Sequence, residues 1–329
     1  MTNGTPLVSV VVPCFNGGRF LQETLESIFA QTYKELEVIL VEDGSTDNTA
    51  EIIRSHGDRV RCKFQANSGG GPAREAGTKM ARGEFIQYVD QDDLLFPDAI
   101  EKRLAALMAS GGDVAYSDWQ WLEEMEDGAF IPSTIRARTI EEANADAQIA
   151  LFSEWWTPLV GLLYRRRVVE RITWKKCLVD DARFLFDACV AGARFVHVPG
   201  VRAYYRVHRS GASRDRLRWF QDVFERAEYI EAIWQRDDAL TQERRAALIS
   251  YYAEIEEYAK KRDRKLQRGA LKHIFSLERR SVIYRLLIQW LGYGSMQRVA
   301  MIRDLLLGKK YVGKKLVRGT ILAHPRWDP

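Results

Sequence analysis

Short apolar runs alternate with amphipathic stretches through the first hundred residues of the chain. Runs rich in Val, Ile and Leu at residues 7–12 and 36–41 are typical of strands buried on both faces of a sheet. Shorter strands are predicted over residues 60–65 and 85–89. Apolar positions spaced three and four apart predict amphipathic helices over residues 19–31, 49–55 and 73–81. This alternation predicts an α/β fold with a mainly parallel central sheet and helices on both faces.

Beyond residue 98 the pattern changes, and longer helical stretches take over. We expect a helix over 99–109, a strand over 113–118, a helix near 140–152 and otherwise irregular structure from 120 to 150. Two long amphipathic helices are predicted over about 216–235 and 241–262. The chain is therefore expected to form two domains, an α/β domain over 1–214 and a helical C-terminal extension over 215–329.

The net charge of +4 is unevenly distributed. Residues 260–318 hold 17 Lys and Arg but only 3 Asp and Glu, which leaves the rest of the chain with a net charge of −10. A basic tail on an acidic body is expected to meet an anionic surface, such as lipid headgroups. The alternative is an amphipathic helix packed on the rest of the chain, with its basic side chains in solvent. Nucleic acid is not expected as a partner, because no recognised binding module accompanies the charge.

Composition is that of an ordinary soluble protein, with 329 residues, 46% of them hydrophobic and 29% charged. No apolar run is long enough to predict a membrane-spanning helix, and the N-terminus lacks the pattern of a signal peptide. The four cysteines are scattered without a C-x-x-C pair. We therefore expect neither a zinc site nor a disulfide framework, and a reducing compartment.

Three carboxylates, Asp90, Asp92 and Asp93, follow the predicted strand 85–89. Alternate side chains share a face of an extended chain, so Asp90 and Asp92 can converge on one cation. A divalent ion such as Mg²⁺ or Mn²⁺ takes one or two protein carboxylates and completes its shell with phosphate oxygens and water. Ligands collect beyond the carboxyl ends of strands in open α/β sheets, where these residues fall. The alternative is a solvated acidic turn that precedes the next helix.

Residues 67–74 are predicted to form a glycine-rich loop that leads into the helix predicted over 73–81. Backbone N–H groups at a helix N-terminus favour anions. Arg74 adds a planar fork of donors that suits a nucleotide or diphosphate better than a lysine would. The alternative is a surface loop with a solvated arginine.

Several motifs occur in a fixed order along the chain: 8–16 (VSVVVPCFN), 27–33 (SIFAQTY), 37–47 (EVILVEDGSTD), 67–77 (NSGGGPAREAG) and 90–93 (DQDD). In order and spacing they resemble the family-2 glycosyltransferases, whose catalytic domain has the GT-A fold, a Rossmann-like α/β fold. The resemblance covers roughly residues 7–213. It departs from the family pattern at Glu42, where an aspartate is more usual, and at Glu75, where many relatives have asparagine.

The resemblance implies a nucleotide site at the ends of the first two strands. Pro13 is expected to end the first strand, so that the loop to Asn16 lies where family members hold the nucleotide. Asp43 resembles the aspartate that accepts a hydrogen bond from the base. Its alternative role is to cap the helix after Ser45, which Asp47 can do instead.

The same resemblance assigns a donor and metal site. Asp90 would contact the ribose, and Asp92 and Asp93 would hold the metal, Mn²⁺ or Mg²⁺. Residues 204–209 (YYRVHR) resemble the segment that closes the family's active site. There Arg206 would contact a phosphate, and His208 would be a further metal ligand or a diphosphate contact, although a lone histidine is also often structural.

An acidic pair near residue 180 completes the implied site. Residues 178–186 (LVDDARFLF) resemble the family's pair at the start of a helix, whose second member, here Asp181, is the catalytic base. Asp180 is the alternative base, and both residues could instead cap the helix and complement its dipole. Residues 155–157 (WWT) fall where acceptor-facing residues commonly occur, and core packing explains them nearly as well. Asp118 is a weaker candidate for a contact on the acceptor side.

Together these features predict an inverting, metal-dependent glycosyltransferase that moves a sugar from a nucleoside-diphosphate sugar, expected to be a UDP-sugar, to an acceptor hydroxyl. The resemblance implies assembly of a bacterial surface polysaccharide or glycolipid, with a carbohydrate or lipid-linked acceptor. The expected place is the cytoplasm, at the inner face of the cell membrane. One alternative is a nucleotidyltransferase on a related fold, which residues 14–19 fit poorly. Another is a catalytically inactive nucleotide-sugar-binding or membrane-scaffolding subunit.

Overall fold

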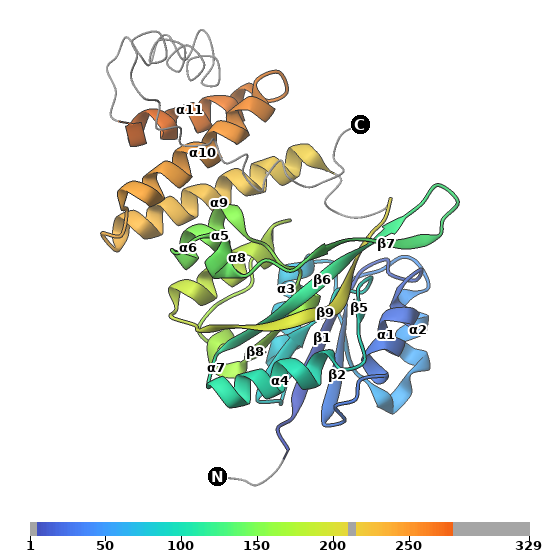
Figure 1. Cartoon of the computed structure of the whole chain (residues 1–329). Coiled ribbons are helices and arrows are strands. Elements are labelled where there is room, and N and C mark those ends of the chain that lie inside the picture. The colour runs from blue at the N-terminus through green and yellow to red at the C-terminus, as the bar shows by residue number, and fades with distance from the viewer. Residues whose placement is uncertain (1–4, 210–214, 279–329) are drawn as a thin grey trace. The chain divides into compact units, whose positions relative to one another are not determined.

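The computed structural model describes residues 5–209 and 215–278 (Figure 1). Contacts divide the chain into two compact units, Met1–Leu151 with Trp155–Arg214, and Phe152–Glu154 with Asp215–Pro329. The predicted division at residue 214 differs from this one only in residues 152–154. The basic stretch beyond Glu278, for which membrane binding is predicted, lies outside the described residues.

In the described part of the chain, the first unit is built on one nine-stranded sheet. Its strands are β1 Val8–Cys14, β2 Leu36–Glu42, β3 Arg61–Phe64, β4 Phe85–Tyr88, β5 Leu94–Leu95, β6 Val114–Glu124, β7 Phe130–Arg136, β8 Leu162–Arg165 and β9 Phe195–Val207. They lie in the order β3-β2-β1-β4-β8-β6-β9-β5, with β7 paired to β6. The neighbours from β3 to β4 are parallel, whereas β8 runs antiparallel between β4 and β6.

Helices cover both faces of this sheet, as predicted. They are α1 Leu21–Phe29, α2 Thr49–Ser55, α3 Gly70–Met80, α4 Ala99–Ser110, α5 Ile140–Ala143, α6 Ala147–Ile149, α7 Arg166–Val169 and α8 Asp180–Val190. The alternation of β1 explains the layering, because Val8, Val10 and Val12 join a core cluster with residues of α1 and α4. Val11 faces α3 instead, and a Cβ added at Gly77 of α3 would lie 2.4 Å from its Cγ1.

The glycine-rich stretch before Arg74 is mostly helical and not a loop, which corrects the prediction. Helix α3 begins at Gly70, so Pro72 lies in its first turn, where a missing N–H costs no helical hydrogen bond. A Cβ on Gly71 would lie 1.9 Å from the carbonyl oxygen of Lys175, so only glycine fits there. Pro13 likewise does not end β1, which continues to Cys14. The pairing of β1 with β4 stops at Val11, before the proline.

Residues 120–150 are more regular than predicted. They contain the end of β6 and the whole of β7, which form a hairpin that projects from the sheet in Figure 1. The helix predicted near 140–152 is divided into α5, α6 and a π-helical turn at Ala150–Glu154. Helix α5 starts with a capping box formed by Thr139 and Glu142 and ends at Asn144, whose extended backbone interrupts the helix.

The second unit consists, among the described residues, of helices α9 Arg216–Arg236, α10 Gln242–Ala259 and α11 Arg264–Glu278. The first two confirm the long helices predicted over 216–235 and 241–262. Their apolar faces pack together, and Phe220 of α9 stacks on Tyr258 of α10 with ring centroids 3.6 Å apart. Across both described segments, no helix combines the length and apolar character needed to cross a bilayer.

Candidate active site

The carboxyl ends of β1, β2 and β4 meet at one edge of the sheet, because these strands are parallel neighbours. The loops that follow them are tied together. Asn16, after β1, accepts a hydrogen bond of 2.8 Å from the backbone N–H of Thr46, after β2. Gln91, after β4, pairs with both backbone groups of Phe15 at 2.8 Å. The loops for which the sequence motifs predict a nucleotide site and a metal site therefore lie together at this edge.

Asp43, at the end of the β2 segment, is 2% exposed and holds the loop that leads into α3. Its carboxylate accepts hydrogen bonds from the backbone N–H groups of Ser68 at 3.0 Å and Gly69 at 2.8 Å. Asp47 and not Asp43 accepts a bond near the start of α2, from the N–H of Thr49 at 3.0 Å. The contact of Asp43 with a nucleotide base stays a prediction.

Arg74 joins the end of β4 to the start of α8. Its guanidinium lies 2.5 Å from Asp90 and 2.8 Å from Asp180, and the residue is 7% exposed. Burial alone would lower the pKa of Arg74, but the charges of Asp180 and Asp90 raise it overall. Burial raises the pKa of Asp180 to about 7, against the opposing effect of Arg74. The arginine thus bridges two acidic segments that lie far apart in the sequence.

The two aspartates at the start of α8 take different partners. Asp180 is buried against Arg74. Asp181 is half-buried, and its Oδ2 accepts a hydrogen bond of 3.0 Å from the indole N–H of Trp156. The charge of Asp181 raises the pKa values of both Arg74 and Asp90, after larger effects of burial and nearer charges. Asp181 therefore belongs to the same site and is the more accessible of the two carboxylates.

The predicted metal ligands separate into a pair and a single residue. Asp92 Oδ2 and His208 Nε2 lie 2.8 Å apart. Asp93 is 1% exposed, and its Oδ1 accepts a hydrogen bond of 2.9 Å from the backbone N–H of Arg206 in β9. Burial, together with the charges of Asp92 and Asp90, raises the pKa of Asp93 well above its ordinary value. The structure thus brings Asp92 and His208 together and binds Asp93 to β9.

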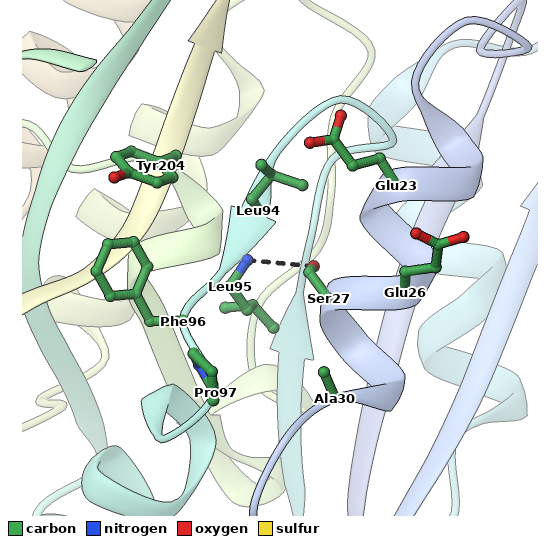
Figure 2. Close-up of a pocket in the computed structure, with 9 residues that line it drawn as sticks. All are labelled: Glu23, Glu26, Ser27, Ala30, Leu94, Leu95, Phe96, Pro97 and Tyr204. Atoms are coloured by element: carbon green, nitrogen blue, oxygen red, sulfur yellow. Dashed lines mark hydrogen bonds between the residues drawn. The ribbon is translucent and has the colours of Figure 1, made fainter. Parts of the chain in front are cut away.

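Arg206 is enclosed by other side chains. Its guanidinium lies 2.7 Å from Glu23 and between the rings of Phe20 and Phe130, at 4.7 and 5.0 Å from their centroids. Glu23 also lines a groove of about 490 Å³ between α1 and the β5 segment, shown in Figure 2, which none of the predicted site residues lines. The contact of Arg206 with a phosphate stays a prediction.

Comparison with known proteins decides the family. The family model "Glycosyl transferase family 2" matches residues 9–170. Over 228 residues the chain is 31% identical to the uncharacterized glycosyltransferase YibD of Escherichia coli, and this match spans 65% of the chain and 65% of that relative. Residues 9–170 of the chain belong to the family-2 glycosyltransferases.

Solved structures share the fold of this family-2 chain. Staphylococcus aureus TarS 1–349 in complex with UDP-GlcNAc matches with a TM-score of 0.62 at 21% identity, over 82% of this chain and 80% of that chain. The mannosyltransferase PcManGT from Pyrobaculum calidifontis, in complex with GDP-Man and Mn²⁺, matches with a TM-score of 0.52 at 18% identity, over 93% and 81%. The likeness confirms the predicted GT-A fold, which here carries the additional helices α9–α11.

The side chains of this family-2 chain that could bind a metal suit a divalent ion. A carboxylate and an imidazole, here those of Asp92 and His208, suit Mn²⁺, and phosphate oxygens and water can complete its shell. Like charge is concentrated beside them, since the charge of Asp92 raises the pKa values of Asp90 and Asp93. Among the residues that the structure describes, no three His, Cys, Asp or Glu side chains form a metal-binding group. A metal here would therefore depend on further ligands from a bound nucleotide sugar.

Sequence reasoning missed some residues of the family-2 site. Gln91 lies inside the acidic motif, and its position between aspartates was the available signal for a link to the loop after β1. Nothing local predicted that Glu23 would pair with Arg206. Asp118 pairs with His197 at 2.7 Å and accepts a hydrogen bond of 2.6 Å from the N–H of Gly200. Its contact with an acceptor stays a prediction.

Proposed function

We propose that the chain is an inverting glycosyltransferase that moves a sugar from a nucleoside-diphosphate sugar, a UDP-sugar, to an acceptor hydroxyl. The observation that carries the proposal is the arrangement around Arg74. This residue joins Asp90, at the strand end, to Asp180, while the neighbouring Asp181 offers an accessible carboxylate to the same site. UDP-GlcNAc bound to TarS supports a UDP-sugar donor, and GDP-Man and Mn²⁺ bound to PcManGT support a nucleotide sugar with a metal.

In the proposed reaction, the acceptor oxygen bonds to the anomeric carbon while its proton passes to Asp181. The bond from that carbon to the diphosphate breaks on the opposite face, which inverts the configuration. A positioned base contributes about 10²–10⁴-fold to such a step. Asp180 is the weaker candidate for the base because it is buried against Arg74, so we assign it to holding the arginine.

The donor is proposed to lie over the loops at the sheet edge. Contacts to the nucleotide are assigned to Pro13, Asn16, Asp43, Arg74 and Asp90. When bound, Mn²⁺ or Mg²⁺ held by Asp92 and His208 would neutralise charge on the diphosphate. We propose a carbohydrate or lipid-linked acceptor; the charge imbalance of residues 260–318 supports an approach to an anionic membrane surface.

Release of UDP or GDP from a panel of UDP-sugars and GDP-mannose, with and without Mn²⁺, tests the proposal. The wild-type chain is expected to turn over one of these donors. Asp181→Asn is expected to lose about 10²–10⁴-fold in kcat, while the thermal shift produced by the donor is unchanged. Asp187→Asn, on the same helix and paired with Arg183, is the matched control. Donor binding without turnover in the wild type would contradict the proposal and support the scaffolding alternative.

A further inference from the structure

Trp156 is held by aromatic rings from the β6 and β9 strands. Its ring lies edge-on to those of Trp119 and Tyr205, each with centroids 5.3 Å away, and tilted against Trp121 at 6.3 Å. Trp119 and Trp121 are 3% and 4% exposed, so they form part of the packed interior. Because these neighbours stand on paired strands, the indole of Trp156 has a defined position and its N–H a defined direction.

That N–H points at the proposed base. Trp156 Nε1 donates to Oδ2 of Asp181 at 3.0 Å, and the backbone N–H of Ala182 donates to Oδ1 at 2.7 Å. An indole has a donor and no acceptor, so this contact requires Asp181 to accept. Each carboxylate oxygen of Asp181 thus has one N–H donor, which together restrain the rotation of the carboxylate.

We propose that Trp156 is a positioning residue for Asp181, an inference that rests on the function proposed above. A catalytic carboxylate must be held within about 0.5 Å of its productive position, and the helix terminus alone fixes only one of its oxygens. The rigid aromatic cluster fixes the other through the indole N–H.

Kinetics of Trp156→Phe test the proposal, because phenylalanine keeps an aromatic ring and loses the N–H. With the donor that the wild type turns over, kcat is expected to fall about 10–100-fold, with KM for the donor changed less than about threefold. Trp119→Phe perturbs the same aromatic cluster but leaves the indole N–H of Trp156 in place. Trp119→Phe is therefore expected to lower kcat less than Trp156→Phe does.

A double variant separates positioning from general damage to the fold. If Trp156 acts through Asp181, adding Trp156→Phe to Asp181→Asn should lower the residual rate less than twofold. The inference is overturned if Trp156→Phe lowers kcat by the same factor in the wild type and in Asp181→Asn. It is also overturned if Trp156→Phe and Trp119→Phe lower kcat equally. Such a result leaves the proposed function intact. The proposed function fails separately if Asp181→Asn keeps full activity or if the wild type turns over no donor. Either of those results also removes the inference.

The hydrogen bond itself can be observed without catalysis, which matters if Trp156→Phe does not fold. The chain has nine tryptophans, whose indole N–H signals can be followed by ¹⁵N NMR. Asp181→Ala is expected to shift one indole proton upfield by about 0.5 ppm or more, as a charge-assisted bond is lost. That signal should be the one missing from Trp156→Phe, and Asp187→Ala should not move it. An indole spectrum that Asp181→Ala leaves unchanged refutes the contact and the inference with it.

Discussion

Carboxylates gather both at the end of β4 and in the helical unit, but they meet different partners. In the helical unit, Glu231 is 5% exposed and accepts hydrogen bonds from Tyr252 at 3.0 Å and from His273 at 2.8 Å. The other ring nitrogen of His273 lies 2.9 Å from Glu228. The hydrogen bond to Glu231 raises the pKa of His273, against the opposing effect of burial. A protonated His273 thus supplies the charge and the donors that this cluster needs.

At the end of β4 the charges are not balanced in the same way. Asp90 and Asp180 share Arg74, but burial and the charge of Asp92 still raise the pKa of Asp93. The buried Oδ2 of Asp93 finds no hydrogen-bond partner among the described residues. Uncompensated negative charge costs stability and is tolerated where a ligand can neutralise it. We propose from this comparison that the cluster at the end of β4 serves binding, and that the cluster in the helical unit serves stability.

Among the variants that test this comparison, the largest effect should come from Asp92→Asn. We expect loss of the Mn²⁺-dependent part of the thermal shift with UDP and a fall of at least about 100-fold in kcat, because a ligand of the proposed metal is removed. Without ligands, the melting temperature should stay the same or rise, since repulsion with Asp90 and Asp93 is relieved. Differential scanning fluorimetry with and without Mn²⁺ and UDP measures these quantities. A lower melting temperature without ligands would show that Asp92 is structural and would break the comparison.

Local sequence was sufficient for the first half of the fold. Continuous β-branched residues in β1 and β2 leave little choice but strands buried on both faces, and such strands are parallel and end at a common edge. The acidic motif directly after β4 therefore had to lie at that edge. The placement of Asp43 and Asp90 at strand ends follows from the same reasoning.

Partners that are distant in sequence were beyond this reasoning. Arg74 pairs with Asp180, 106 residues away, and Arg206 with Glu23, 183 residues away. Any exposed carboxylate could serve such an arginine equally well on local grounds, so only packing decides between them. Helix α3 shows the same limit, because the close approach of the Lys175 carbonyl explains Gly71, one of the glycines that suggested a loop.

Glu231→Ala tests the other side of the comparison. It leaves Tyr252 and His273 without their shared buried acceptor, so we expect the free energy of unfolding to fall by about 2–3 kcal/mol. Urea denaturation measures the change. Since Glu231 lies in the helical unit, kcat of the folded variant should equal that of the wild type. Asp237→Ala, at an exposed ion pair with Arg236, is the control and should leave the urea midpoint unchanged. A fall in kcat without a fall in stability would contradict the assignment.

The smallest predicted effect is a pH dependence that separates the two clusters. The pKa of His273 is raised in the folded protein above its ordinary value of 6.5, so folding binds a proton more tightly there. The resulting stabilisation is complete below about pH 6.5 and is lost as the pH rises through the raised pKa. Burial and then the charge of Glu231 raise the pKa of Tyr252, which therefore keeps its proton in this window. Urea denaturation from about pH 6 to about pH 9 should therefore show the stability difference between wild type and His273→Gln shrinking as the pH rises. If this stability difference instead grows with pH, His273 is bound as the neutral ring. The charge balance that distinguishes this cluster from the one at β4 would then not exist.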